Sequence, residues 1–167
     1  MTLYLFILAA IRKMEIPFFS IVIPTHNRAT FIGKAIESVI GQIYDKWELV
    51  IVDDGSTDNT KEVILSFNDD RVIYIYQENS ERSAARNNGI RNAKGKYICF
   101  LDSDDFYEKN HLKTLHKEIQ KLDYPKAMFF CNVSRIENGI KNKVPTESIG
   151  DYKNPIEFIL LAKESVI

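Results

Sequence analysis

Short apolar runs rich in β-branched and aromatic residues recur along the chain, and polar or turn-forming residues bound each of them. Apolar runs of about four to eight residues are typical of strands buried on both faces of a sheet. The pattern predicts strands over Phe18–Pro24, Glu48–Val52, Arg71–Tyr76, Lys96–Leu101 and Ala127–Val133.

The segments between these strands carry apolar residues at helical spacing. They predict helices over Phe31–Ile43, Ser83–Ala93 and Asn110–Leu122, with a further short helix after the Asp53-Asp54-Gly55 turn that Ser56 or Thr57 caps. The positions expected to face the core are Ile32, Ala35, Ile36, Val39, Ile40, Ile43, Val63, Ile64, Phe67, Leu112, Leu115, Ile119 and Leu122. The Ser83–Ala93 helix is instead rich in small residues, which let a helix approach a sheet or a ligand closely.

Strands that alternate with helices favour a parallel α/β sheet with right-handed crossovers. A chain of 167 residues suits one domain with a core of its own. The pattern weakens after Val133, where Asn138-Gly139 is typical of a hairpin turn and Pro155–Lys163 of a short helix.

The N-terminal residues Thr2–Ile11 are apolar and are followed by Arg12 and Lys13. Ten residues are too few to cross a bilayer as a helix, which needs about 20. A secretory signal would carry its positive charge before the apolar run rather than after it. Two interpretations remain, a weak anchor at a membrane surface or an upstream extension of a chain that starts at Met14, and we favour the second.

Composition excludes several classes of protein. Hydrophobic residues make up 45% and charged residues 27% of the chain, which excludes disorder as the main state. The 22 basic and 23 acidic residues give a net charge of −1, so we expect no nucleic-acid partner. Cys99 and Cys131 lie inside apolar runs and no zinc-ligand spacing occurs, so both are expected to be core residues of a protein in the reducing cytoplasm.

Polar side chains concentrate where the predicted strands end. Pro24-Thr25-His26-Asn27-Arg28 follows the first strand, Asp53-Asp54-Gly55-Ser56 the second and Asp102-Ser103-Asp104-Asp105 the fourth. Ligands of open α/β sheets bind beyond the carboxyl ends of the strands. We therefore expect the five aspartates to gather near one crevice.

Like charges held close together need a cation, and a hard divalent metal with oxygen ligands is the simplest one. Arg82 and Arg86, at the start of the helix before the fourth strand, are typical of an anion site at a helix N-terminus. The aspartate carboxylates, the divalent metal they need and the two arginines together suggest a nucleoside diphosphate ligand. The first strand is followed by neither a dinucleotide-binding GxGxxG nor a P-loop GxxxxGK[ST], and no paired aspartates of a haloacid-dehalogenase-like phosphatase stand there.

Simpler explanations compete for individual residues. An Asp-Gly turn alone would explain Asp53 and Asp54, and Asp53 would then only cap the turn at Ser56. Asp105 is equally well explained as a helix cap, and Arg82 and Arg86 could be exposed helix charges. Asn87 could serve packing or a hydrogen bond to the loop. His111 and His116 are expected on the surface of one helix.

The segments that contain these motifs, SIVIPTHNRATFIGKAIESVIGQIYDKWELVIVDDGSTDNT and NSERSAARNNGIRNAKGKYICFLDSDD, resemble the family 2 glycosyltransferases. The resemblance runs from about Phe18 to Val133. It implies a GT-A fold, a Rossmann-like three-layer sandwich with a mostly parallel sheet. It also implies transfer of a sugar from a nucleotide-diphosphate donor, with a family bias to UDP, to an acceptor hydroxyl, usually with inversion.

The resemblance also implies roles for individual residues. Asp102 and Asp104 would bind Mn²⁺ or Mg²⁺ that carries the diphosphate, and Asp54 would contact the nucleobase. The donor-binding residues are expected to be Pro24, Thr25, His26, Asn27, Asp53, Asp54, Arg86 and Ser103. Position 26 is His where the family more often has Tyr.

We divide the chain into an N-terminal extension (1–13), a nucleotide-sugar-binding domain (14–135) and the start of an acceptor-side region (136–167) that we interpret as truncated. No acidic residue of the last segment stands in a recognisable base motif, so the catalytic base is not assigned. The alternative is a non-catalytic nucleotide-sugar-binding module or an inactive fragment. As partners we expect a nucleotide-diphospho-sugar donor and a saccharide or lipid-linked saccharide acceptor used in cell-surface polysaccharide or glycan synthesis. The expected location is the cytoplasm, with peripheral association at the inner face of the membrane as one option.

Overall fold

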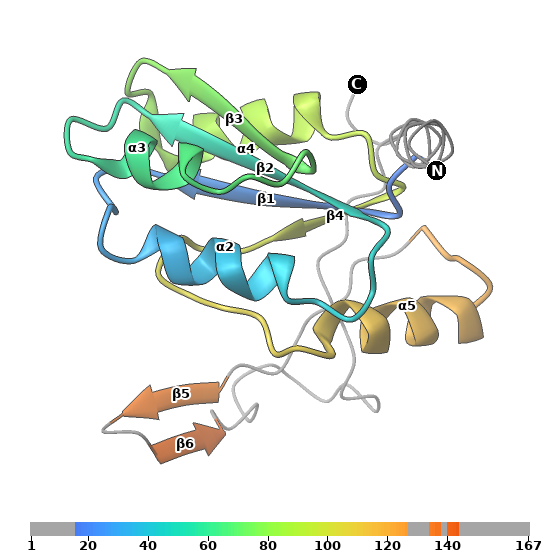
Figure 1. Cartoon of the computed structure of the whole chain (residues 1–167). Coiled ribbons are helices and arrows are strands. Elements are labelled where there is room, and N and C mark those ends of the chain that lie inside the picture. The colour runs from blue at the N-terminus through green and yellow to red at the C-terminus, as the bar shows by residue number, and fades with distance from the viewer. Residues whose placement is uncertain (1–15, 127–133, 138–139, 144–167) are drawn as a thin grey trace, which may run out of the picture.

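In the computed structural model, residues 16–126, 134–137 and 140–143 are described. Four parallel strands form one sheet in the order β3-β2-β1-β4 (Figure 1). They are β1 (Phe19–Thr25), β2 (Trp47–Asp54), β3 (Val72–Gln77) and β4 (Tyr97–Phe100). Because β1 lies in the centre and the chain builds outward from it on both sides, the sheet has a topological switch point between β1 and β4.

Helices cover both faces of the sheet, which gives three layers (Figure 1). They are α2 (Ile32–Ile40), α3 (Thr60–Leu65), α4 (Glu81–Asn92) and α5 (His111–Lys121). One core joins Ile21 and Ile23 of β1 to α2, α3 and α5, and the other joins Val22 to α4. This alternation follows from the period of two in a strand, which turns successive side chains to opposite faces. The predicted parallel α/β sandwich is confirmed.

Two positions predicted to face the core are exposed. Ile43 is 48% exposed and Leu122 is 57% exposed, so the predictions for both were wrong. Each lies beyond the last helical residue, because α2 ends at Ile40 and α5 ends at Lys121. Helical spacing therefore no longer places their side chains on the apolar stripe.

The start of α3 also differs from the prediction, because neither Ser56 nor Thr57 caps it. The helix begins at Thr60, whose backbone N–H donates to the Asp58 carboxylate at 3.0 Å. The hydrogen bond from the Thr60 hydroxyl, followed by backbone N–H donors, lowers the pKa of Asp58. Ser56 and Thr57 are thereby left to bind the loop that follows β1.

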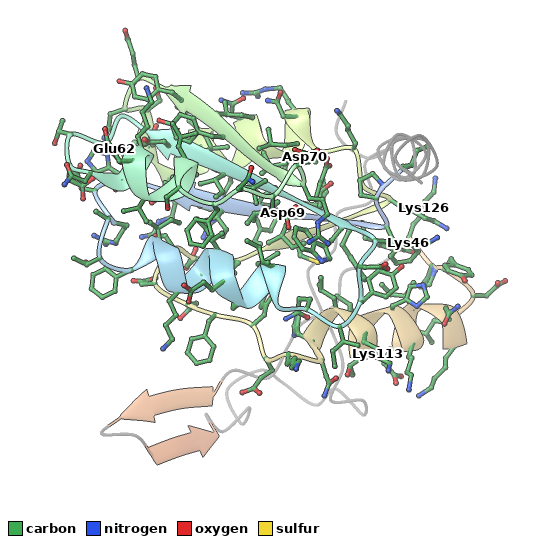
Figure 2. The ribbon with its side chains drawn as sticks, in the orientation of Figure 1. Lys46, Glu62, Asp69, Asp70, Lys113 and Lys126 are labelled. Atoms are coloured by element: carbon green, nitrogen blue, oxygen red, sulfur yellow. The ribbon has the colours of Figure 1, made fainter. Side chains whose placement is uncertain are left out.

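The edge strand β3 is fastened to its neighbour through Arg71, the residue before it. The Arg71 guanidinium lies 3.6 Å from the centre of the Trp47 ring and pairs with the Asp69 carboxylate at 2.6 Å. Asp69 is labelled in Figure 2. A cation held flat on an indole covers the apolar ring and stabilises the contact. The start of β3 is thus set in register against the start of β2.

Helix α4 lies close to the sheet because its facing residues are small. Ala85, Gly89 and Ala93 are buried against Val22 of β1 and its neighbours. A Cβ atom added at Gly89 would stand 2.3 Å from Cγ1 of Val22. The predicted close approach of this helix is confirmed, and glycine is required at its tightest point.

Substituting Gly89 by alanine should therefore lower the free energy of unfolding by about 1–3 kcal/mol, the usual cost of overpacking a core. The loss is expected although alanine favours helix more than glycine does. Urea denaturation checks it. The double variant Val22→Ala/Gly89→Ala, which removes the clashing methyl group, should recover part of the loss in a double-mutant cycle. A Gly89→Ala protein more stable than the original would contradict the packing described here.

The hairpin turn predicted at Asn138-Gly139 lies outside the described residues, and the strands on either side of it are β5 (Ser134–Glu137) and β6 (Ile140–Lys143). They pair antiparallel, with Glu137 opposite Ile140. The predicted strand Ala127–Val133, the predicted helix Pro155–Lys163, Cys131 and the N-terminal apolar segment lie outside the described residues. None of the described helices combines the length and the apolar character needed to cross a membrane.

Candidate functional site

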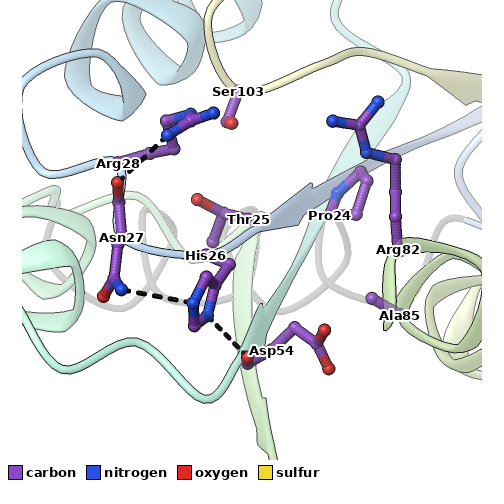
Figure 3. Close-up of a pocket in the computed structure, with 9 residues that line it drawn as sticks. All are labelled: Pro24, Thr25, His26, Asn27, Arg28, Asp54, Arg82, Ala85 and Ser103. Atoms are coloured by element: carbon purple, nitrogen blue, oxygen red, sulfur yellow. Dashed lines mark hydrogen bonds between the residues drawn. The ribbon is translucent and has the colours of Figure 1, made fainter. Parts of the chain in front are cut away.

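A pocket of about 410 Å³ opens at the carboxyl ends of the strands, next to the switch point of the sheet. It is lined by Pro24, Thr25, His26, Asn27, Arg28, Asp54, Arg82, Ala85 and Ser103 (Figure 3). These residues come from the ends of β1 and β2, from the first turns of α4 and from the loop after β4. Parallel strands bring such residues together because all their carboxyl ends meet at one edge.

Asn27 joins the loops that follow β1 and β2. Its backbone has a positive φ of 50°, which asparagine tolerates better than most residues. Its backbone N–H donates to the Ser56 hydroxyl at 2.9 Å, and its side-chain oxygen accepts the Thr57 N–H at 2.8 Å. These bonds fix the rim of the pocket beside His26.

His26 lies at the same end of the pocket as Asp54. Its Nδ1–H donates to the backbone carbonyl of Asp54 at 2.8 Å, a partner that can only accept. Nε2 then accepts from the Asn27 side-chain amide at 3.2 Å. Two bonds hold the imidazole in place, and its exposed ring can stack on a planar base.

The two neighbouring aspartates at the end of β2 have different surroundings. Asp53 is 1% exposed, accepts the Ser56 N–H at 2.9 Å and accepts the Tyr74 hydroxyl at 2.8 Å. Burial, and then the bond to Asp53, raise the pKa of Tyr74. Asp53 thus lies outside the pocket lining and shapes it through the turn it holds, whereas Asp54 lines it.

Arginine and serine side chains make up the opposite end of the pocket. Figure 3 shows the guanidinium groups of Arg28 and Arg82 on either side of the Ser103 hydroxyl. From the sequence, Arg82 was explained equally well as a ligand contact or as an exposed helix charge, and Arg28 was not among the predicted donor-binding residues. Its position directly after Pro24-Thr25-His26-Asn27 was the available signal, because that whole segment leaves the carboxyl end of a strand.

Arg86, one helical turn beyond Arg82, does not line the pocket. It forms an ion pair with Asp102, with 2.8 Å between the guanidinium nitrogen and the carboxylate oxygen. Both side chains are about a third or more exposed, so the pair contributes only modestly to stability. Arg86 is therefore paired with the loop that carries Asp102, and its contact to a donor stays a prediction.

The five aspartates do not form one cluster of metal ligands. In the part of the chain that the structure describes, no three His, Cys, Asp or Glu side chains are grouped closely enough to hold a metal ion. Asp53 is bonded inside its own turn, while burial foremost, and then the charges of Asp104 and Asp102, raise the pKa of Asp105. Asp102 and Asp104 remain as oxygen donors, and two carboxylates are what Mg²⁺ or Mn²⁺ typically takes from a protein when phosphates fill the other positions.

Thr25 gives independent support for a polar ligand in the pocket. Its hydroxyl oxygen is buried and has no hydrogen-bond partner among the described residues. A buried hydroxyl without a partner costs about 1–3 kcal/mol. Because Thr25 lines the pocket, a hydroxyl or phosphate group of a ligand there would satisfy it.

A set of hydrogen bonds that the sequence did not indicate holds the loop after β4. The Tyr107 hydroxyl donates to the Phe100 carbonyl at 2.9 Å, and the Tyr107 N–H donates to the Ser38 hydroxyl at 3.0 Å. The buried Gln42 side chain donates to the Glu108 carbonyl at 2.8 Å. These contacts tie the end of the segment that carries Asp102 and Asp104 to its start at Phe100, to α2 and to Gln42 just beyond α2.

The two histidines of α5 are half-buried, so the expectation that they lie on the surface was wrong. The His111 ring stacks on Tyr107 with 4.1 Å between ring centroids, and burial lowers the pKa of His111 to about 4. The His116 ring contacts Phe18 and Tyr44, and burial lowers its pKa as well. Tyr107 lies before the start of α5, and Phe18 and Tyr44 are distant in sequence, so the pattern of the helix alone could not indicate these aromatic surroundings.

The burial of His111 predicts how stability depends on pH. An unfolded histidine has a pKa of about 6.5, so the folded state holds this proton less tightly than the unfolded state does. The contribution of neutral His111 to stability should be complete above pH 6.5. The free energy of unfolding should then fall by about 2–3 kcal/mol as the pH drops to 4. Urea denaturation of the original protein and of His111→Phe, which keeps the stacked ring, measures it. Equal pH dependence in the two proteins would contradict the assignment.

The pocket combines residues that can contact a base, a buried hydroxyl and two arginines, and Asp102 and Asp104 flank its lining residue Ser103. The chain belongs to glycosyl transferase family 2, whose family model matches residues 20–164. The predictions of this family and of the GT-A fold are thereby confirmed.

Named relatives and solved structures agree with this assignment. The glycosyltransferase GlyA of Streptococcus pneumoniae is 42% identical over 102 residues, which are 60% of this chain and 15% of GlyA. An uncharacterized glycosyltransferase of Rickettsia prowazekii is 37% identical over 121 residues, which are 72% of this chain and 38% of that protein. This chain therefore spans well under half the length of either relative.

Among solved structures, the Staphylococcus aureus TarS 1–349 complex with UDP is similar, with a TM-score of 0.66 and 28% identity over 77% of this chain and 38% of that one. The mannosyltransferase PcManGT of Pyrobaculum calidifontis, in complex with GDP-Man and Mn²⁺, has a TM-score of 0.58 and 26% identity. That match covers 75% of this chain and 38% of the mannosyltransferase.

Proposed function

We propose that this chain is the donor-binding part of a glycosyltransferase that moves a sugar from a UDP-sugar to an acceptor hydroxyl. The observation that carries the proposal is one pocket with two chemically different ends, Asp54 and His26 at one and Arg28, Arg82 and Ser103 at the other. The nucleobase binds at the first end and the diphosphate at the second. The complexes of TarS with UDP and of PcManGT with GDP-Man support a nucleotide sugar as the ligand.

Each end performs a distinct task in donor binding. The imidazole of His26 stacks on the base, and the Asp54 carboxylate accepts a hydrogen bond from it. The Thr25 hydroxyl, which has no partner among the described residues, bonds a hydroxyl or phosphate oxygen. The two arginines donate to the diphosphate with the forked geometry that suits phosphate oxygens.

Asp102 and Asp104 would hold the divalent metal, Mn²⁺ or Mg²⁺. When bound, the metal neutralises the negative charge that develops on the departing nucleoside diphosphate. Arg28 and Arg82 add fixed positive charge at the same place, so part of the leaving-group stabilisation belongs to the chain itself.

The reaction is proposed to invert the configuration at the anomeric carbon. Inversion requires a carboxylate base opposite the leaving group, which deprotonates the acceptor hydroxyl. The acceptor is proposed to be a saccharide or a lipid-linked saccharide of a cell-surface polysaccharide. A cytoplasmic location is proposed because the two cysteines of the sequence do not form the framework of a disulfide-rich protein.

Titration of the chain with UDP, with and without Mn²⁺, tests the proposal by calorimetry. We expect UDP to bind in both conditions and more tightly with Mn²⁺. In a separate assay, incubation with a UDP-sugar should slowly release UDP. Binding without any sugar transfer or donor hydrolysis would favour a non-catalytic nucleotide-sugar-binding module. No binding of UDP under either condition would contradict the proposal.

A further inference from the structure

A row of hydrogen-bonded side chains runs from Asp54 away from the pocket. The Gln77 side-chain nitrogen donates to Asp54 Oδ1 at 2.6 Å, and the Asn88 side-chain nitrogen donates to Gln77 Oε1 at 2.8 Å. Asn92 closes the row by donating to Asn88 Oδ1 at 3.0 Å. The row links the last residues of β2 and β3 to one face of α4.

The carboxylate at the head of the row fixes the direction of every amide in it. Carboxylate oxygens only accept, so the Gln77 side chain must turn its NH₂ group toward Asp54. Its carbonyl oxygen then faces Asn88, which must donate. Such aligned amides polarise one another, and the bond to the buried charge is the strongest in the row.

This bond makes the two oxygens of Asp54 unequal. The Ser80 backbone N–H, at the start of α4, also donates to Oδ1, at 2.9 Å. Among the described residues both hydrogen bonds of the Asp54 carboxylate thus fall on Oδ1. Asp54 is only 4% exposed and lines the pocket, so Oδ2 is the acceptor left for a ligand.

An oxygen that only accepts distinguishes nucleobases by their hydrogen-bonding edge. Uracil and thymine carry a ring N–H at position 3 and guanine carries one at position 1, whereas cytosine and adenine present a lone pair there. A lone pair that faces a carboxylate oxygen forms no bond and is repelled. Uracil and cytosine are therefore a matched pair of probes for the orientation of Asp54.

We infer that Gln77 is a positioning residue that holds the Asp54 carboxylate with Oδ2 toward the base and thereby makes the site prefer uracil to cytosine. The inference rests on the proposed function, because it takes the Asp54 end of the pocket as the base site. Without Gln77 the carboxylate keeps, among the described residues, only the bond from the Ser80 N–H and can rotate about its side-chain bonds.

The experiment compares the affinities of UDP and CDP for the original chain and three variants. The original is expected to bind UDP at least about 10-fold more tightly than CDP, since one charged hydrogen bond is lost with cytosine. Gln77→Leu should weaken the binding of UDP about 10-fold and the binding of CDP less than about 3-fold, so the preference for UDP over CDP should largely disappear. Asn88→Ala should change the ratio in the same direction by a smaller factor. Asn92→Ala, at the exposed end of the row, is the matched control and should leave both affinities unchanged.

The ratio separates positioning from a structural role, because a merely destabilised pocket loses both nucleotides equally. An unchanged ratio in a folded Gln77→Leu protein that still binds UDP overturns the inference alone. If Gln77→Leu does not fold, Asn88→Ala decides, since it keeps Gln77 and removes only the donor to its carbonyl. An original chain that binds neither nucleotide overturns the proposed function and this inference with it.

Discussion

Replacing Asp104 by alanine should remove the Mn²⁺-dependent part of UDP binding, a loss of about 100-fold or more in affinity at saturating metal. Changing a residue that only orients a metal ligand costs about 10–100-fold in metal affinity, and Asp104 is proposed to be a ligand itself. Its side chain is exposed, so the substitution should leave the fold intact. Calorimetry with UDP at increasing Mn²⁺ measures the effect.

Two further variants make this measurement specific. Glu62→Ala removes an exposed carboxylate of α3 that does not line the pocket, and it should keep the full Mn²⁺ dependence. Asp102→Ala should lose the Mn²⁺ dependence but bind UDP somewhat more tightly without metal, because it frees the Arg86 guanidinium from its ion pair. An Asp104→Ala protein with unchanged response to Mn²⁺ would remove the metal assignment.

The edge of the sheet where the site lies was predictable from sequence. Each strand is a distinct apolar run, and the polar motifs that follow three of them meet because parallel strands end on the same side. Asp53 and Asp54 could also have been separated in advance. Leu49 and Ile51 face α2 while Val50 and Val52 face α4, so the period of two sends Asp53 to the first face and Asp54 to the second.

Other parts of the site depend on contacts that no local pattern contains. Arg82 and Arg86 lie on the same helix one turn apart, yet one lines the pocket and the other pairs with Asp102. Gln42 bonds the loop at Glu108 across 66 positions of sequence. Such pairings depend on how the layers pack together. The sequence of the helix or of the loop, taken by itself, contains no sign of them.

Removing both arginines of the pocket is expected to have the second large effect, because they are proposed to bind the diphosphate directly. A hydrogen bond to a charged group contributes about 1.5–3 kcal/mol, so Arg28→Ala and Arg82→Ala should each weaken metal-free UDP binding about 10-fold or more. The double variant should lose about 100-fold, and the affinity of the original should fall steeply as ionic strength rises.

Uridine, which lacks the diphosphate, serves as the internal control and should bind the original chain and the double variant equally well. Arg91→Ala, an exposed arginine in the last turn of α4, is the matched surface control and should bind UDP normally. Arg82→Lys keeps the charge without the fork and should fall between the original and Arg82→Ala. Equal losses of UDP and uridine in the double variant would mean that the arginines support the pocket wall, and the diphosphate would then have to bind elsewhere.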